Sequence, residues 1–273
     1  MGVDAPSGWA ETDAALVRAI AEVAEAQGRP VLIALAGSQG SGKSTLAARL
    51  VGLLEAAGLR TAVLALDDFY LSRAARLRLA GEIHPLLATR GVPGTHDLAR
   101  LHAALDALLA GASWAVPRFD KTTDDLGPQA EWREIPGPVD VVLLEGWCLG
   151  ARSQDAAALA LPVNALEASE DADRRWRDWV NRQLAGPYAA LFARFDLSIL
   201  LKAPDFAVVA DWRAEQERGL VRSPGGLPRM TGPDIARFIA HYERITRAML
   251  EDEPTDIVVE LDFARVPRAI RCT

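Results

Sequence analysis

Lysine is scarce in this 273-residue sequence. Lysine and arginine together number 30, yet Lys43, Lys121 and Lys202 are the only lysines. A lysine ammonium is a compact charge on a flexible stem, whereas an arginine guanidinium is a planar fork, so the two are not interchangeable. A position that keeps lysine against this bias is a candidate for a function, the alternative being an ordinary surface charge.

Other absences narrow the class of protein. The sequence has two cysteines, Cys148 and Cys272, no apolar run of membrane length and no signal-peptide pattern. We therefore expect no disulfide framework and no membrane partner, and a cytoplasmic location. The formal net charge of −7 argues against a basic surface that would bind nucleic acid. We expect a small-molecule partner, and the sequence leaves the oligomeric state open.

The apolar content is high enough for a full core, with 50% hydrophobic and 25% charged residues. We expect one α/β domain over residues 1–273. Apolar runs predict buried strands at residues 31–36, 61–70, 139–147, 197–203 and 255–263. Helical spacing of apolar residues predicts helices at 9–27, 44–58, 98–109 and 235–249. Strands that alternate with helices indicate a mostly parallel, doubly wound sheet flanked by helices.

A glycine-rich stretch, GSQGSGKST at residues 37–45, joins the first predicted strand to a predicted helix. It fits the pattern G-x-x-x-x-G-K-[ST] in the context that this pattern requires. Glycines let consecutive N–H groups converge on an anion, and the helix N-terminus adds partial positive charge. The sequence therefore predicts a P-loop NTPase fold that binds ATP through Gly37, Ser38, Gln39, Gly40, Ser41, Gly42, Lys43, Ser44 and Thr45.

Two predicted strands end in carboxylates, and the carboxyl ends of parallel strands should meet beside this loop. Lys43 is predicted to reach the β and γ phosphates, while Ser44 and Glu145 are predicted to hold Mg²⁺. For Glu145 the alternative is an ordinary strand-end charge.

Asp67 and Asp68 lie at the end of the second predicted strand. Because successive strand side chains point to opposite faces, we assign Asp67 as the general base that accepts a proton from an attacking hydroxyl. The alternative is that both carboxylates only cap a turn.

Seven motifs occur in this order between residues 31 and 250: GSQGSGKST, LDDFYLS, RGVPGTHDL, FDKT, VVLLEGWCLG, DWRAEQE and FIAHYERIT. Together they resemble the plant-type D-glycerate 3-kinases and their fungal and bacterial ATP-binding relatives. More distantly they are similar to uridine kinase, pantothenate kinase and phosphoribulokinase. The segment TTDDLGPQAEW at residues 122–132 departs from the pattern, because it lacks the Gly-Asp-Arg segment of the plant enzymes.

The resemblance implies a kinase whose catalytic base is Asp67 and whose substrate pocket includes Tyr70, Arg90 and His96. It also implies a mobile lid at about residues 205–230. Arg213, Arg218 and Arg222 are spaced so that one of them could neutralise the transferring phosphoryl group, and the resemblance favours Arg213 as catalytic. The alternative for these arginines is a solvated helix face.

Two predicted substrate loops, at about residues 67–96 and 117–138, carry cations and acceptors that suit a small hydroxy acid. The first holds Arg90 and His96, and the second holds Arg118, Asp120 and Lys121. Ordinary surface roles are the alternative for His96 and Arg118. We therefore expect an ATP- and Mg²⁺-dependent kinase for D-glycerate. The alternatives are a kinase for a nucleoside or pantothenate-like alcohol, and a nucleotide-dependent regulator that transfers nothing.

Overall fold

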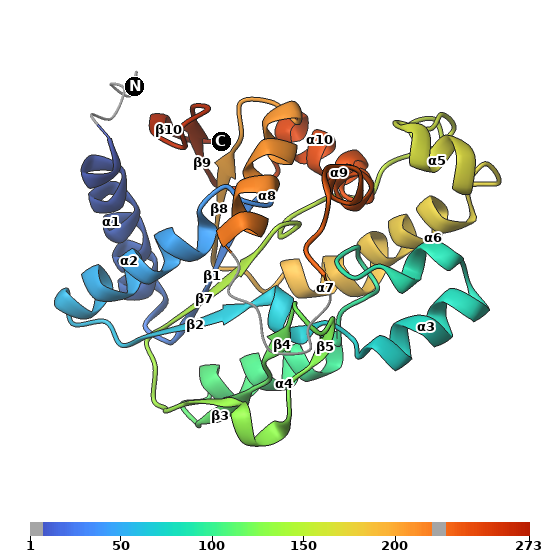
Figure 1. The fold of residues 1–273 in the computed structure, drawn as a ribbon. Coiled ribbons are helices and arrows are strands. Elements are labelled where there is room, and N and C mark those ends of the chain that lie inside the picture. Colours follow the sequence, from blue (N-terminus) through green and yellow to red (C-terminus); the bar gives the residue numbers. More distant parts are fainter. Residues whose placement is uncertain (1–7, 220–227) are drawn as a thin grey trace.

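A six-stranded sheet forms the centre of the chain, with the strand order β10-β9-β8-β1-β7-β2 (Figure 1). The computed structural model describes residues 8–219 and 228–273. The sheet strands are β1 (Val31–Gly37), β2 (Thr61–Ala65), β7 (Val141–Gly146), β8 (Leu197–Lys202), β9 (Ile257–Leu261) and β10 (Pro267–Cys272). All pairings are parallel except that of β10 with β9. The expected α/β fold with a mostly parallel sheet is confirmed.

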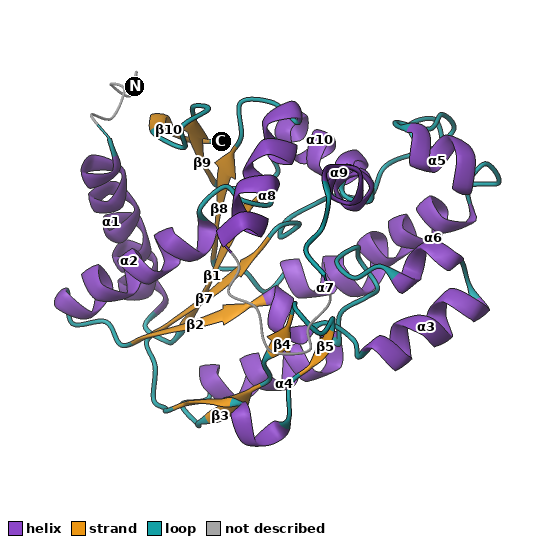
Figure 2. Cartoon of the chain, viewed as in Figure 1, coloured by secondary structure: helices purple, strands orange, loops and turns teal. Residues whose placement is uncertain are grey.

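Helices lie on both faces of this sheet (Figure 2). They are α1 (Trp9–Gln27), α2 (Lys43–Ala56), α3 (Arg73–Glu82), α4 (Leu98–Leu109), α5 (Ala165–Glu170), α6 (Arg175–Gln183), α7 (Ala189–Phe192), α8 (Ala207–Gly219), α9 (Gly232–Ala240) and α10 (Glu243–Asp252). Every residue of β1 is buried. Leu32 packs into one core cluster and Ile33 into a second, because alternate side chains of a strand point to opposite faces. This explains why the strand shows no polar alternation.

Two short hairpins extend from the sheet edge. β3 (Trp114–Val116) pairs with β6 (Arg133–Ile135), and β4 (Phe119–Asp120) pairs with β5 (Asp125–Leu126). The second hairpin carries Lys121 and Asp124 in its turn.

Two predicted elements differ in the structure. The strand predicted at residues 61–70 ends at Ala65, and a 3-10 turn, η1 (Leu66–Phe69), follows. The helix predicted at 235–249 is two helices, because the backbone N–H of Tyr242 bonds three residues back to Ile239 and interrupts the α-helical pattern.

Some expectations stay predictions. The lid predicted at about residues 205–230 begins with α8, and Arg222 lies outside the described residues. The extent of the domain over residues 1–273 also stays a prediction. Among the helices of the described ranges, none has the length and apolarity needed to span a bilayer.

Candidate active site

The glycine-rich stretch forms a loop between β1 and α2 whose backbone favours glycine at two points. Gly40 and Gly42 have φ angles of 73° and 93°, in the left-handed region. A Cβ atom on Gly40 would also lie 2.7 Å from the backbone of Trp212. The buried Oγ atoms of Ser38 and Ser41 have no hydrogen-bond partner among the described residues. Unpaired buried hydroxyls in a loop that opens a helix fit a phosphate group as their partner.

Lys43 and Ser44 begin α2 at the end of this loop. The Nζ atom of Lys43 donates to the carbonyl oxygen of Ser38 at 3.0 Å. Burial lowers the pKa of Lys43, although the charges of Glu145 and Asp67 oppose this. Ser44 Oγ donates to Glu145 Oε1 at 2.6 Å. A hydroxyl and a carboxylate are the oxygen ligands that Mg²⁺ prefers, so this pair could hold the ion.

The Asp67 carboxylate has a partner on each oxygen. Tyr70 Oη donates to Oδ1 at 2.7 Å, and Lys121 Nζ donates to Oδ2 at 2.6 Å. Burial alone would raise the pKa of Asp67, but the charge and hydrogen bond of Lys121, together with the hydrogen bond of Tyr70 and the charge of Lys43, outweigh burial and hold it well below its usual range. Asp67 is therefore ionised at neutral pH, which is the state that can accept a proton.

Asp68 lies in the same 3-10 turn but in a different environment. Its nearest hydrogen-bond donor is the backbone N–H of Phe119, at 3.5 Å. Burial, reinforced by the charge of Asp67, raises the pKa of Asp68 to about 6. The strand geometry used to separate the two carboxylates is wrong, because both lie beyond the end of β2. Their partners, not strand alternation, make them different.

These groups border one cavity of about 170 Å³. Of the residues predicted from sequence, it is lined by Gln39, Gly40, Lys43, Ser44, Asp67, Tyr70, Arg90, Lys121, Glu145 and Arg213. The lining also includes residues that were not assigned to the site, namely Asp68, Trp147, Gln216, Phe238 and Tyr242. The structure therefore brings the predicted phosphate, metal, base and acceptor groups together around one space.

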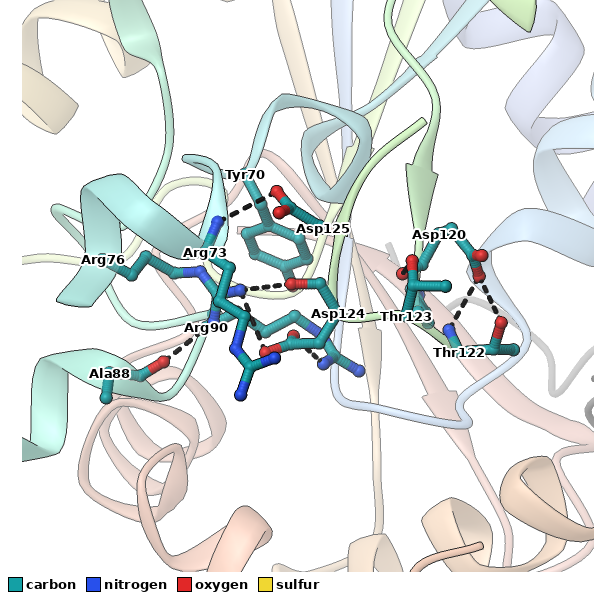
Figure 3. Close-up of polar contacts among 12 residues, drawn as sticks. Tyr70, Arg73, Arg76, Ala88, Arg90, Asp120, Thr122, Thr123, Asp124 and Asp125 are labelled. Atoms are coloured by element: carbon teal, nitrogen blue, oxygen red, sulfur yellow. Dashed lines mark hydrogen bonds and ion pairs between the residues drawn. The ribbon is translucent and has the colours of Figure 1, made fainter. Parts of the chain in front are cut away.

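Arg90 is held on several sides. The centre of its guanidinium group lies 5.6 Å from the centroid of the Phe119 ring and 5.6 Å from that of the Phe238 ring. Its Nη1 atom forms an ion pair with Asp124, which also pairs with Arg76 (Figure 3). Arg90 thus reaches the cavity as a fixed planar cation.

Arg213 approaches the cavity from α8. Its Nη2 atom donates to Glu217 at 3.0 Å. Its Nη1 atom is buried and has no hydrogen-bond partner in the part of the chain that the structure describes. The solvated helix face that was the alternative for Arg213 is excluded, because the residue is only 4% exposed.

Two predicted substrate residues are not part of the cavity lining. His96 lies behind Tyr70, with ring centroids 4.7 Å apart. The carboxylate of Asp120 accepts hydrogen bonds from the backbone and hydroxyl of Thr122, as Figure 3 shows. Asp120 therefore stabilises the turn of its own hairpin, which is the reason that it does not face the cavity. Arg118 is exposed and also lies outside the lining.

The remaining lysine, Lys202, has a structural partner. Its Nζ atom pairs with Glu253 Oε1 at 2.5 Å, at the end of β8 and outside the cavity lining. Of the three lysines, Lys43 and Lys121 therefore border the cavity and Lys202 does not.

Buried histidines predict a pH dependence of stability. Burial lowers the pKa of His96 and of His241 from 6.5 to about 4. Between pH 6.5 and pH 4 both histidines are protonated in the unfolded chain but neutral in the folded chain. The free energy of unfolding therefore falls as the pH drops from about 6.5 towards 4. Each histidine should contribute on the order of 3 kcal/mol to this loss.

Chemical denaturation at pH 7 and at pH 4.5 measures the effect. The variants His96→Gln and His241→Gln should each lose less stability on acidification than the unaltered chain. If both variants lost as much stability on acidification as the unaltered chain, the two histidines would not be the source of the pH dependence.

Sequence comparisons agree with this geometry. A family model described as methylmalonyl Co-A mutase-associated GTPase MeaB matches residues 6–71, which include the P-loop. The chain is 32% identical over 232 residues to the uncharacterized kinase mug58 of Schizosaccharomyces pombe, covering 79% of each chain. It is 29% identical over 231 residues to the chloroplastic D-glycerate 3-kinase of Arabidopsis thaliana, covering 81% of this chain but 48% of the plant protein.

A solved structure shares the fold. The D-glycerate 3-kinase from Cryptococcus neoformans superposes with a TM-score of 0.77 at 23% sequence identity. The match covers 96% of this chain and 99% of the fungal one. At this identity the likeness concerns the arrangement of helices and strands.

Proposed function

Because this chain belongs to the family of P-loop kinases that includes mug58 and the D-glycerate 3-kinases, we propose that it transfers the γ-phosphoryl group of ATP to a hydroxyl of D-glycerate. The neighbouring serine hydroxyl and carboxylate, Ser44 and Glu145, would hold Mg²⁺. When bound, this ion neutralises charge on the phosphates.

The observation that carries the proposed acceptor is the charge around Arg90. Arg76 is fully buried, and Arg90 is nearly so. Both pair with the single carboxylate of Asp124 (Figure 3). Two guanidinium groups and one carboxylate leave one positive charge, and of the two arginines only Arg90 lines the cavity. A buried charge needs a partner, so this geometry favours an acceptor with one carboxylate.

The other groups have distinct proposed roles. Asp67, kept ionised by Lys121, accepts the proton of the attacking hydroxyl. Lys43 binds the β and γ phosphates. Arg213, whose Nη1 atom has no hydrogen-bond partner within residues 8–219 and 228–273, neutralises the transferring phosphoryl group. Tyr70 orients the Asp67 carboxylate through its hydroxyl.

The space beside the phosphates favours a small acceptor over a nucleoside or a pantothenate-like alcohol. The whole cavity measures about 170 Å³ and is bordered by Lys43, Ser44 and Glu145 as well as by Arg90, so the acceptor shares it with the phosphates. Trp147 and Tyr242 also line it. A three-carbon acid with a terminal hydroxyl suits this space.

A coupled assay of ADP release tests the proposal. With ATP and Mg²⁺ present, D-glycerate should raise ADP production at least tenfold above the rate without an acceptor, since no attacking hydroxyl is otherwise positioned. A panel of other hydroxy acids, sugars, nucleosides and pantothenate should stimulate less. If only a nucleoside stimulates ADP release, the acceptor is a nucleoside and not D-glycerate. If only a protein does so, the chain is a nucleotide-dependent regulator.

A further inference from the structure

The ring of Phe238 contacts two cations of the cavity. The guanidinium centre of Arg90 lies 5.6 Å from the ring centroid, and that of Arg213 lies 5.3 Å from it. Phe238 comes from α9, whereas Arg90 precedes α4 and Arg213 belongs to α8. One aromatic side chain therefore joins two arginines that no secondary structure element connects.

The two arginines have different neighbours around the cavity. Arg213 directly follows Trp212, whose backbone packs against Gly40 of the P-loop. Arg90 lies beside Asp124 and the hairpin that carries Lys121. The first is therefore on the phosphate side and the second on the acceptor side, and the ring of Phe238 contacts both.

Other contacts leave Arg213 incompletely fixed. Its Nη2 atom donates to Glu217 at 3.0 Å and to the Met230 sulfur at 3.6 Å, but its Nη1 atom has no hydrogen-bond partner among the residues that the structure describes. Arg90 has more restraints, namely the ion pair with Asp124 and the ring of Phe119. The face of an aromatic ring attracts a guanidinium group electrostatically, and this attraction is stronger where water is excluded. Phe238 is thus a principal restraint on the plane of Arg213.

A second aromatic residue, close to Phe238 in sequence, fixes the backbone of Arg90. Tyr242, which follows α9, donates its hydroxyl to the carbonyl oxygen of Arg90 at 2.7 Å. The rings of Tyr242 and Phe238 are 4.9 Å apart. Both aromatics line the cavity.

We propose that Phe238 is a positioning residue that fixes Arg90 and Arg213 relative to one another. The acceptor and the phosphoryl group are thereby held at the relative position that transfer needs. The inference rests on the proposed kinase function. It adds that the acceptor-side and phosphate-side cations are coupled through one aromatic ring. An aliphatic side chain of similar size would fill the space but would offer no π face to either cation.

Steady-state kinetics of Phe238→Leu test the role. The KM for D-glycerate should rise about tenfold and kcat should fall about tenfold, because both cations lose a shared restraint. The KM for ATP should change less than about twofold, since the P-loop is untouched. Phe238→Tyr, which keeps the π face, should retain most activity.

A matched control exists outside the cavity. The guanidinium centre of Arg49 lies 4.4 Å from the centroid of the Trp9 ring, and neither residue lines the cavity. Trp9→Leu therefore removes the same type of contact and should leave kcat and both KM values unchanged. Equal losses in Trp9→Leu and Phe238→Leu, or a Phe238→Leu enzyme with unaltered kinetics, would overturn the proposal. Phe238→Met provides a second test should the leucine variant not fold.

Arginine side-chain NMR separates this inference from the choice of acceptor. An aromatic ring shifts the resonances of groups above its face, so the Nε–H signals of Arg90 and Arg213 should both move in Phe238→Leu and stay in Trp9→Leu. This result is expected whether or not D-glycerate stimulates ADP release. Movement of neither signal would overturn the inference, whereas a failure of D-glycerate alone would overturn only the proposed acceptor.

Discussion

Replacing Asp67 with asparagine is expected to lower kcat by roughly 10² to 10⁴ while ATP binding stays close to normal. Asparagine keeps the shape of the side chain and can still accept the hydroxyl hydrogen bond of Tyr70. It cannot take up the proton of an attacking hydroxyl. Because Asp67 is held ionised by Lys121, its ability to accept that proton is the property that the substitution removes.

Asp68→Asn is the matched control for this experiment. Asp68 is the neighbouring carboxylate in the same turn and lines the same cavity. It has no cation at hydrogen-bond distance among the described residues. Its substitution should cost much less than that of Asp67. Equal losses in the two variants, or a larger loss for Asp68→Asn, would show that the base is misassigned, and small losses in both would leave the pair as turn residues.

Replacing Lys43 with alanine is expected to lower kcat by roughly 10² or more, because a preorganised cation at the phosphates acts on charge that develops during transfer. The side chain is half-buried, and its protein hydrogen bond is to one backbone carbonyl, that of Ser38. The fold should therefore survive the substitution, which circular dichroism and thermal unfolding would verify. Near-normal turnover would contradict the assignment of this loop as the ATP site.

Lys202→Ala is the corresponding control, since it removes the same side chain at the end of β8. Lys202 pairs with Glu253, and neither residue lines the cavity. Its removal should alter turnover less than about twofold, because a partly exposed ion pair contributes little. A large loss of turnover in this variant would show that removing any lysine lowers the rate, and the effect of Lys43→Ala could then not be assigned to phosphate binding.

The parts of this protein that the sequence determined are those fixed by short-range rules. The P-loop follows from residues 37–45 alone, because glycine spacing, the lysine and the following helix are contiguous. The strand at residues 31–36 and the capped helix after Asp97 also depend on neighbours within a few positions. The parallel sheet then places Glu145 beside Ser44, since the carboxyl ends of adjacent parallel strands meet at one edge.

Only the tertiary structure decided the environment of each side chain. Asp67 differs from Asp68 because Lys121, which is 54 residues away, reaches one of them and not the other. Asp120 faces its own turn, while Asp124 joins the buried Arg76 to Arg90. Such pairings depend on contacts between distant segments, and a single sequence does not specify which partners those segments meet.

Phe238 shows that the neighbours of an apolar side chain also depend on the tertiary structure. Its helical spacing with Ile235 and Ile239 correctly predicts a helix with a buried face. Spacing cannot distinguish an aromatic ring that packs against aliphatic side chains from one that packs against two guanidinium groups. That difference arises when α8, α9 and the segment before α4 converge on the cavity, because the character of a buried contact depends on the neighbours that folding brings to it.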